Sequence, residues 1–317
     1  MKKGIILCID TINYTTSVAI IGIDGELIAN IKRPLTVKPG ERGLRQSDAV
    51  FAHVKNIPSA MEEARTYLVD STVLAVGVSE KPRNVEGSYM PCFLSGVAVA
   101  EGIATSLGVP LYRFSHQCGH IMAALYSSGR TDLLEREFCA FHVSGGTTEV
   151  LRVNKSGAAF RAELVGGTAD INAGQLIDRI GVHMGLPFPA GPHIEKLAVE
   201  NTKKIPSVKL KINDGKVNLS GAENLAVALF TKSQDPRLTS AYVLAYVTEA
   251  LSLLASDYEE RFGSTEFVFA GGVMSNSIIK SALSKRFKAS FATPACSADN
   301  AVGIACLAMR AYNSEIQ

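Results

Sequence analysis

The chain has 317 residues, of which 47% are hydrophobic and 20% are charged, a composition typical of a folded globular protein and not of a disordered one. Its formal net charge is +2, from 32 Lys and Arg against 30 Asp and Glu. This balance gives no strong electrostatic argument for nucleic-acid binding, although a local basic face could still exist. The length exceeds that of one ordinary core, so we expect two lobes.

Targeting and membrane signals are missing from the sequence. The first residues have a basic start and an apolar run, but Asp10, Asn13 and several threonines interrupt the run and no cleavage site follows. No stretch approaches the roughly 18 uninterrupted apolar residues of a membrane span. The six cysteines form no C-x-x-C pair, which predicts reduced, mostly buried thiols. We therefore expect a cytoplasmic protein without a membrane partner.

Apolar runs and turn signals alternate in the first part of the chain. Asp24–Gly25 is a hairpin signal, and Pro58 is expected to break the helix that contains it. In chain order we predict strands over 4–10, 17–23 and 26–33, a helix over 45–68, a strand over 72–79, a helix over 95–108 and a strand over 109–115.

A similar pattern returns in the second part. The stretch 138–154 predicts a strand, a Gly-rich turn and a second strand. Residues 6–22 near the start show the same order of strand, polar turn and strand. It is followed by a long amphipathic helix over 239–263, a strand over 266–273, a helix over 275–287 and a final small-residue helix over 299–313. Two halves of this kind predict a duplicated α/β fold.

His116 and His120 are four positions apart in the stretch FSHQCGHIM. On a helix this spacing places both imidazoles on one face, one turn apart, where they could hold a metal ion together. Two ligands alone do not decide between a metal site and two packed or capping histidines, because a catalytic site needs a third protein ligand and an open position.

Two glycine pairs follow predicted strands. In VSGGTTE (143–149), successive backbone N–H groups could cradle phosphate or carboxylate oxygens, but an ordinary hairpin turn has the same composition. In FAGGVMSN (269–276), Gly271 and Gly272 would let a nucleoside pass close to the backbone. Asn276 could bond a base or ribose there, or simply cap the next helix.

Two aspartates are further candidates. Asp178 lies on a predicted helix before a Pro/Gly-rich loop that contains Gly191, and its carboxylate could accept bonds from ribose hydroxyls. Asp299 is expected at the start of the last helix, where it either caps that helix or supplies the oxygen ligand that the histidine pair lacks. A set of two histidines and one carboxylate would suit iron or zinc.

At this point the chain resembles a known family. Its ordered motifs are similar to those of the tRNA threonylcarbamoyladenosine synthase family, the TsaD-like group formerly called O-sialoglycoprotein endopeptidase or glycoprotease. The resemblance covers nearly the whole chain and includes HVKNIP near residue 53. The motifs that carry it are SHQCGH, VSGGTTE, NAGQLIDR with PAGP, NLSG, AGGVMSN and ADNAVGIA.

The resemblance implies the actin-like ATPase fold of sugar kinases, Hsp70 and actin, with two duplicated lobes and a ligand cleft between them. We expect one lobe over 1–113, completed by the C-terminal helix 300–317, and a second over 114–299 that carries the metal and nucleotide site. The implied metal ligands are His116, His120 and Asp299, and the metal is iron or zinc. The implied nucleotide contacts are Val143, Ser144, Gly145, Gly146, Thr147, Asp178, Gly191 and Asn276.

The activity implied by the resemblance is acyl transfer to tRNA. A threonylcarbamoyl group would pass from its adenylate to the exocyclic amine of the adenosine beside the anticodon. The implied ligands are an adenine nucleotide or threonylcarbamoyl-adenylate, and the implied partners are tRNA, a smaller actin-like TsaB-like paralogue and a TsaE-like P-loop ATPase. No catalytic acid or base is assigned by the resemblance.

The chain departs from the family pattern at Tyr14, Thr15, Thr147 and Gln175, where the family carries acidic residues or, at Thr147, a histidine. An alternative hypothesis is therefore a divergent nucleotide- and metal-binding paralogue that acts as a non-catalytic or regulatory subunit. A peptidase is the weakest hypothesis, since no nucleophile–base arrangement stands out.

Overall fold

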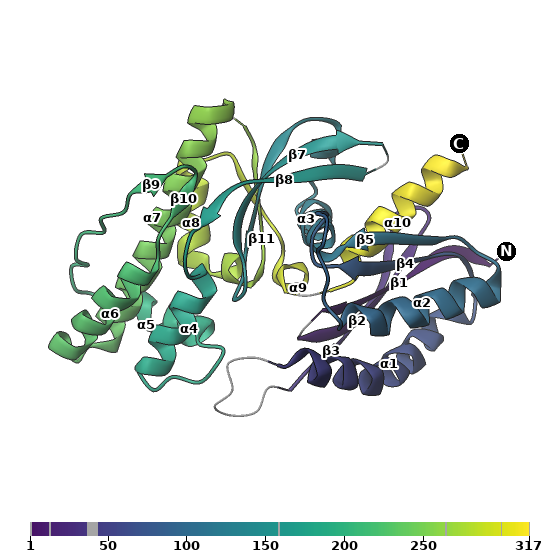
Figure 1. Ribbon diagram of the computed structural model, residues 1–317, viewed down its shortest axis with the longest axis horizontal. Coiled ribbons are helices and arrows are strands. Elements are labelled where there is room, and N and C mark those ends of the chain that lie inside the picture. Colours follow the sequence, from purple (N-terminus) through teal and green to yellow (C-terminus); the bar gives the residue numbers. More distant parts are fainter. Residues whose placement is uncertain are drawn as a thin grey trace. The chain divides into compact units, whose positions relative to one another are not determined.

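The computed structural model describes residues 2–12, 14–36, 44–157, 159–263, 265–298 and 300–316. The chain folds into two compact units (Figure 1). Unit 1 comprises Met1–Arg136, Asn154–Ala162 and Ala298–Gln317, and unit 2 comprises Glu137–Val153 and Glu163–Ser297.

Unit 1 is built on a five-stranded sheet in the order β3–β2–β1–β4–β5. The strands are β1 (Lys3–Ile12), β2 (Thr15–Gly22), β3 (Leu27–Pro34), β4 (Ser71–Lys81) and β5 (Leu111–Ser115). β1 is antiparallel to β2 and parallel to β4. Because helices cover both faces of the sheet, β1 is apolar on both sides, which explains its continuous run GIILCI.

The helices of unit 1 are α1 (Gln46–Leu68), α2 (Phe93–Leu107), α3 (His116–Ser127), the 3₁₀ helix η1 (Thr131–Glu135) and α10 (Val302–Glu315). Figure 1 shows α1 and α2 on one side of the sheet and α10 on the other. Ile5, Leu7 and Ile9 accordingly share a core with Ala60 and Ala100.

Two expectations for unit 1 were wrong. The helix expected to break at Pro58 is continuous from Gln46 to Leu68, because its face with His53, Ile57 and Ala60 is buried and packing outweighs one missing hydrogen bond. The unit also extends beyond residue 113 to include α3, which packs on α10.

A close helix contact accounts for the position of α3. A Cβ atom at Gly303 would lie 1.8 Å from the carbonyl oxygen of Gly119, so the two backbones touch where both helices carry glycine. The two histidines on α3 therefore belong to unit 1 and not to the second lobe, in which the sequence had placed them.

Unit 2 contains a seven-stranded sheet in the order β12–β11–β6–β7–β8–β10–β9. The strands are β6 (Phe138–Val143), β7 (Thr148–Ser156), β8 (Ala159–Thr168), β9 (Ile212–Asn213), β10 (Lys216–Val217), β11 (Phe267–Ala270) and β12 (Ala289–Phe291). β6 is antiparallel to β7 and parallel to β11, so the ends of β6 and β11 lie at the same edge.

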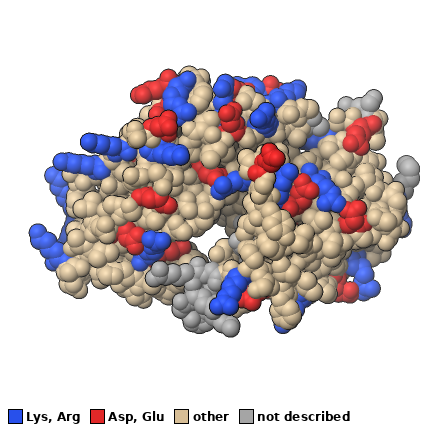
Figure 2. Space-filling view, in the orientation of Figure 1, with Lys and Arg blue, Asp and Glu red and all other residues tan. Residues whose placement is uncertain are grey.

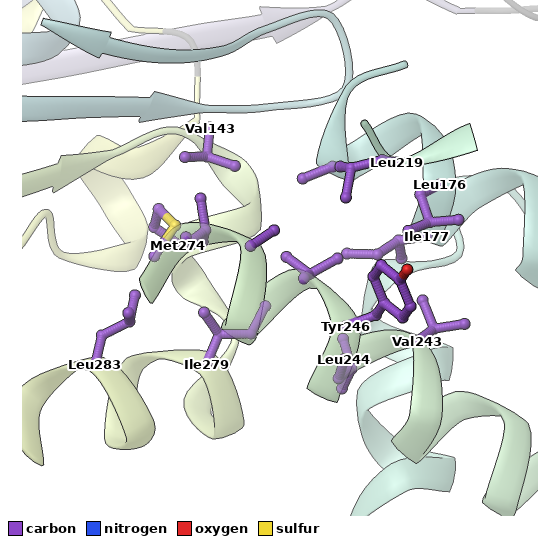
Figure 3. Close-up of a cluster of buried hydrophobic side chains, with 14 of the residues drawn as sticks. Val143, Leu176, Ile177, Leu219, Val243, Leu244, Tyr246, Met274, Ile279 and Leu283 are labelled. Atoms are coloured by element: carbon purple, nitrogen blue, oxygen red, sulfur yellow. The ribbon is translucent and has the colours of Figure 1, made fainter. Parts of the chain in front are cut away.

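The helices of unit 2 are α4 (Ala173–His183), α5 (Gly191–Val199), α6 (Ser220–Ser233), α7 (Pro236–Phe262), the 3₁₀ helix η2 (Gly272–Ser275), α8 (Ser277–Arg286) and α9 (Pro294–Ser297). Figure 3 shows side chains of β6, α4, α7, η2 and α8 meeting in the core, among them Val143, Leu176, Tyr246, Met274 and Ile279. This core lies under the candidate nucleotide residues.

Helix α7 is long and apolar enough to cross a membrane by length and composition alone, and 78% of its most apolar window is buried. Such burial is the pattern of a core helix, so the core of unit 2 explains its apolarity. The six cysteines are free and buried, which confirms the expectation of reduced, buried thiols.

Candidate metal and nucleotide sites

The end of the β1–β2 hairpin carries a group of buried polar side chains. Asp10 pairs with Ser17 and Thr11 pairs with Thr16 across the strands, and all four are fully buried. Thr11 Oγ1 donates to the carbonyl of Cys92 at 3.0 Å and accepts from the N–H of Gly96 at 3.1 Å. These bonds fix the hairpin end against α2, because buried polar groups need partners.

Asp10 holds the first histidine of α3. The distance between Asp10 Oδ2 and His116 Nδ1 is 2.7 Å, and both side chains are buried. Ser115 caps the helix by accepting a hydrogen bond from the N–H of Cys118 at 3.3 Å. With Nδ1 of His116 held by a carboxylate, coordination of a metal would use Nε2.

His120 lies one turn further along α3. The ring centroids of His116 and His120 are 4.4 Å apart at an interplanar angle of 81°, and the two residues are 7% and 5% exposed. The expectation that both imidazoles share one helix face is confirmed. Their role as metal ligands stays a prediction, and the third expected ligand, Asp299, lies outside the described residues.

The residues described around α3 supply two neighbouring imidazoles and a supporting carboxylate, which could form part of a metal site but not a complete one. Among the residues that the structure describes, no group of three or more His, Cys, Asp and Glu side chains is arranged to hold a metal ion. However, a buried imidazole backed by a carboxylate is a common arrangement at metal ligands. Asp10 Oδ1 is also buried and makes no hydrogen bond within the described part of the chain, so this carboxylate retains acceptor capacity beside His116.

His53 is a buried polar residue to which the sequence analysis assigned no role. Its Nδ1 lies 2.8 Å from Thr16 Oγ1, next to the hairpin end described above. Burial lowers the pKa of His53, and the negative charge of Asp10 opposes this shift. The helical spacing of buried residues Ala49, His53 and Ile57 on α1 is the sequence signal that could have identified it.

In unit 2 the stretch Ser144–Thr147 forms a tight turn between β6 and β7. The N–H of Ser144 donates to the carbonyl of Thr147 at 2.8 Å, and the N–H of Gly146 donates to Ser144 Oγ at 3.3 Å. Gly145 and Gly146 are exposed, and a Cβ atom at either would meet nothing within 4 Å. The two glycines therefore leave open space beside the turn.

Two other glycines bring neighbouring segments against this turn. A Cβ atom at Gly174, in the first turn of α4, would lie 2.6 Å from the carbonyl oxygen of Ser144. A Cβ atom at Gly271, after β11, would lie 2.3 Å from the carbonyl oxygen of Val143. The start of α4, the end of β6 and the start of η2 therefore meet at one edge of the sheet, and each of the two glycine pairs follows a strand, as the sequence predicted.

Asp178 and Gly191 are brought together by one hydrogen bond. Asp178 Oδ1 accepts from the N–H of Ala190 at 2.8 Å, and Gly191 is the next residue and the first of α5. Burial raises the pKa of Asp178, and the hydrogen bond from Ala190 opposes that rise. Asp178 thus holds the loop before α5, while its contact with a ribose stays a prediction.

Asn276 caps α8, which was one of the two roles expected for it. Its Oδ1 accepts from the N–H groups of Ile278 and Ile279, both at 3.1 Å, and the residue is 7% exposed. Glu195 on α5 adds a carboxylate at the same helix start, accepting from the N–H of Ser277 at 2.8 Å. No feature of the sequence singled out Glu195.

The structure explains some of the departures from the family pattern. Gln175 Oε1 accepts from the N–H of Asn172 at 2.9 Å and completes a capping box on α4, which a glutamate would complete equally well. Thr147 closes its turn through its backbone, and Thr15 keeps its place in β2 opposite Ile12. Tyr14 is 43% exposed in the turn after β1.

The comparison with known protein families identifies the chain. Residues 27–306 match the family model of TsaD, described as tRNA N6-adenosine threonylcarbamoyltransferase. The chain belongs to the TsaD family. Proteins of this name from Streptococcus suis (strain 05ZYH33) and Bacillus subtilis (strain 168) are 30% and 28% identical to it. The alignments cover 99% and 90% of this chain and 94% and 82% of those relatives.

Solved structures show the fold of this TsaD-family chain. T. kodakarensis HypF matches 99% of the chain with a TM-score of 0.66, over 48% of its own length and at 11% identity. A putative N-acetylmannosamine kinase from Listeria monocytogenes matches 99% of the chain and 100% of its own length, with a TM-score of 0.53 and 14% identity. The fold is the actin-like ATPase fold of sugar kinases, as predicted.

Proposed function

We propose that the protein transfers a threonylcarbamoyl group from its adenylate to the exocyclic amine of the adenosine beside the tRNA anticodon, in the cytoplasm. The observation that supports this proposal is the family match over residues 27–306, in a chain whose buried Asp10–His116 pair and neighbouring His120 retain a metal-type arrangement. A smaller TsaB-like paralogue and a TsaE-like P-loop ATPase belong to the proposal as partners.

The metal in this proposal is iron or zinc, held by His116, His120 and Asp299. When bound, it would polarise the carbonyl of the transferred group as a Lewis acid. Asp10 orients His116 by binding its Nδ1 and favours the tautomer with Nε2 toward the metal. This carboxylate also increases the basicity of the imidazole, which strengthens it as a ligand.

The unit 2 residues would bind the nucleotide part of the adenylate. The N–H groups of Ser144 and Gly146 are bonded within the turn, so those of Gly145 and Thr147 would stabilise negative charge that develops during acyl transfer. Asp178 would accept bonds from ribose hydroxyls while holding Ala190, and Asn276 would bond the nucleoside while capping α8. In the transfer, the amine nitrogen forms a bond to the carbonyl carbon and gives up one proton to solvent, the bond from that carbon to the phosphate oxygen breaks, and AMP leaves.

Deleting the gene is expected to abolish the modified adenosine in cellular tRNA, because the proposal makes this protein the enzyme that transfers the threonylcarbamoyl group to tRNA. Mass spectrometry of nucleosides from total tRNA would measure it. Re-expression of the wild-type protein should restore the modification, and His120→Ala should not. A deletion strain with an unchanged level would contradict the proposed transfer.

A second candidate function is that of a nucleotide- and metal-binding subunit that regulates or scaffolds a complex. The departures at Tyr14, Thr15 and Thr147 favour it, because polar groups that the family carries there are replaced. A second homologue with complete motifs in the same genome, together with an unchanged level of modification after deletion, would support this function over the transfer.

Nucleotide binding is expected to weaken by roughly fivefold in Asp178→Asn and in Asn276→Ser, the effect of losing a hydrogen bond worth about 1 kcal/mol. Both substitutions keep an acceptor for the backbone N–H groups that these side chains bind now. The fold should therefore survive, and calorimetry with ATP and ADP would report the ligand contact alone. Equal affinities in all three proteins would remove both residues from the site.

A further inference from the structure

The segment between α5 and α6 concentrates positive charge in unit 2. Residues 201–218 contain five lysines and one acidic residue, Asp214. Lys203 pairs with Asp235 at 2.7 Å. The other four make no ion pair with any residue in the described part of the chain, and we call them the lysine strip: Lys204, Lys209, Lys211 and Lys216. Figure 2 shows basic side chains gathered on the left of the visible face, where Figure 1 places β9 and β10.

The backbone of this segment is anchored, so the lysines have fixed directions. Val208, Leu210 and Ile212 pack against the core of unit 2, while Lys209 and Lys211 alternate with them and are exposed. The hydroxyl of Tyr246 donates to the carbonyl of Lys209 at 3.0 Å. Alternate residues of an extended segment point the same way about 6.6 Å apart, so the two ammonium groups form a row.

The row continues onto the neighbouring strand. Ile212 of β9 pairs with Val217 of β10, and both side chains point toward the core. Lys211 directly precedes β9 and Lys216 is the first residue of β10, each one position before the paired Ile212 and Val217, so both lie on the opposite, solvent face. Lys209, Lys211 and Lys216 therefore place three positive charges on the solvent side of β10 and of the segment that leads into β9.

Lys216 also borders a hollow of about 380 Å³, a volume within the range of small-ligand pockets. Arg152 and Arg261 lie 4.9 Å and 4.8 Å from the ring centroid of Phe262 in its wall. Glu163 and Asp214 line it as well. Both arginines are ion-paired, Arg152 with Glu137 at 2.7 Å and Arg261 with Asp257 at 3.0 Å, so Lys216 is the cation at this hollow without an ion pair to the described residues.

We propose that the lysine strip docks the sugar–phosphate backbone of the RNA substrate. This inference rests on the proposed function, which makes tRNA the substrate. Phosphate contacts from lysine position nucleic acid without reading its sequence.

Protection of an exposed sheet edge is the competing explanation, because β9 is an edge strand and lysines prevent edge-to-edge pairing. It accounts for Lys211. It does not account for Lys216, which lies on β10 between β8 and β9, or for Lys204, which precedes the strand. The spread of the strip over β10 and the segment that leads into β9 favours an extended polyanion.

The test is the binding of unmodified tRNA, followed by fluorescence anisotropy over a series of salt concentrations. The double variant K209Q/K211Q should bind roughly tenfold more weakly at low salt, and its slope of log affinity against log salt should be shallower by about 1 per lysine. The control K2Q/K55Q removes the same charge from exposed positions of unit 1 and should bind like the wild type. Lys216→Gln should show half of the change in slope.

The following results would contradict the proposal that the lysine strip docks RNA. Equal binding by K209Q/K211Q and the control would overturn it, as would a wild-type protein that binds no tRNA at low salt. Displacement of tRNA by polyglutamate at equal charge concentration would assign the strip to an acidic protein instead. The two experiments separate a failure of the proposed function from a failure of the lysine strip. If only the proposed function is wrong, tRNA binding will still depend on the strip, but the level of modified adenosine will be unchanged in the deletion strain.

Discussion

Gly271→Ala is expected to lower the free energy of unfolding by about 2–5 kcal/mol, from backbone strain and overpacking together. Gly271 has φ 98° and ψ 158°, a region almost closed to residues with a side chain. The new methyl group would also lie 2.3 Å from the carbonyl oxygen of Val143, which is backbone and cannot rotate away. Because total stability is typically about 5–15 kcal/mol, the loss would be a large share of it.

Gly272→Ala is the matched control, since it adds the same methyl group one residue later. A Cβ atom there meets nothing within 4 Å, so we expect the free energy of unfolding to stay within about 0.5 kcal/mol of the wild type. Denaturant unfolding of both variants would measure the difference. Similar stability of the two would show that β6 and η2 can separate without cost, and would remove the close contact from the account of this site.

The second large effect concerns the metal. The purified protein should bind about one equivalent of iron or zinc, and His120→Ala should lose it, because two remaining ligands do not make a competent site. Asp10→Asn should weaken metal affinity by about 10–100-fold, the usual effect of losing the carboxylate behind a histidine ligand. Affinity should also fall as the pH is lowered, since only neutral imidazoles coordinate. Elemental analysis would measure the metal content, and chelator competition would measure the metal affinity.

Cys118→Ser separates this site from general damage to α3. The thiol lies between the two histidines in sequence, and burial raises its pKa. Because it is two residues from each histidine on the helix, it points away from their shared face and is not expected to be a ligand. Metal content should be unchanged in this variant. A protein that takes up no metal, even after reconstitution under reducing conditions, would leave His116 and His120 with a structural role only.

Much of the fold could be predicted because strand patterns and turn residues agree locally. The β2–β3 hairpin follows from its apolar runs and Asp24–Gly25, and the β6–β7 hairpin from its Gly-rich turn. The limits of unit 1 could not be predicted in the same way. They depend on the packing of α3 against α10, between residues almost 200 positions apart, and no local pattern reports such a contact.

The candidate site could be predicted where the helical spacing of residues determines which side chains share one face of a helix. The spacing of His116 and His120 fixed their shared face. The contact of Gly271 with Val143 could not be predicted in this way, because it depends on the pairing of β6 with β11. Asp10 was missed, because its bond to His116 joins residues that only the tertiary structure brings together. Asn276 and Gln175 show the reverse case, in which a capping role accounts for the residue type without any ligand.

Unit 1 is assembled from segments that are far apart in the sequence, and this affects the order in which the chain folds during translation. Its sheet forms from the first part of the chain, yet α10, which covers one face of that sheet and contacts α3, is translated only after all of unit 2. The residues of unit 2 come between these parts in the sequence, so unit 2 can fold while the sheet is still uncovered. The helix that carries His116 and His120 therefore gains α10 as a neighbour only after unit 2 has been made, and a nascent chain stalled before residue 302 would expose apolar strand surface to chaperones.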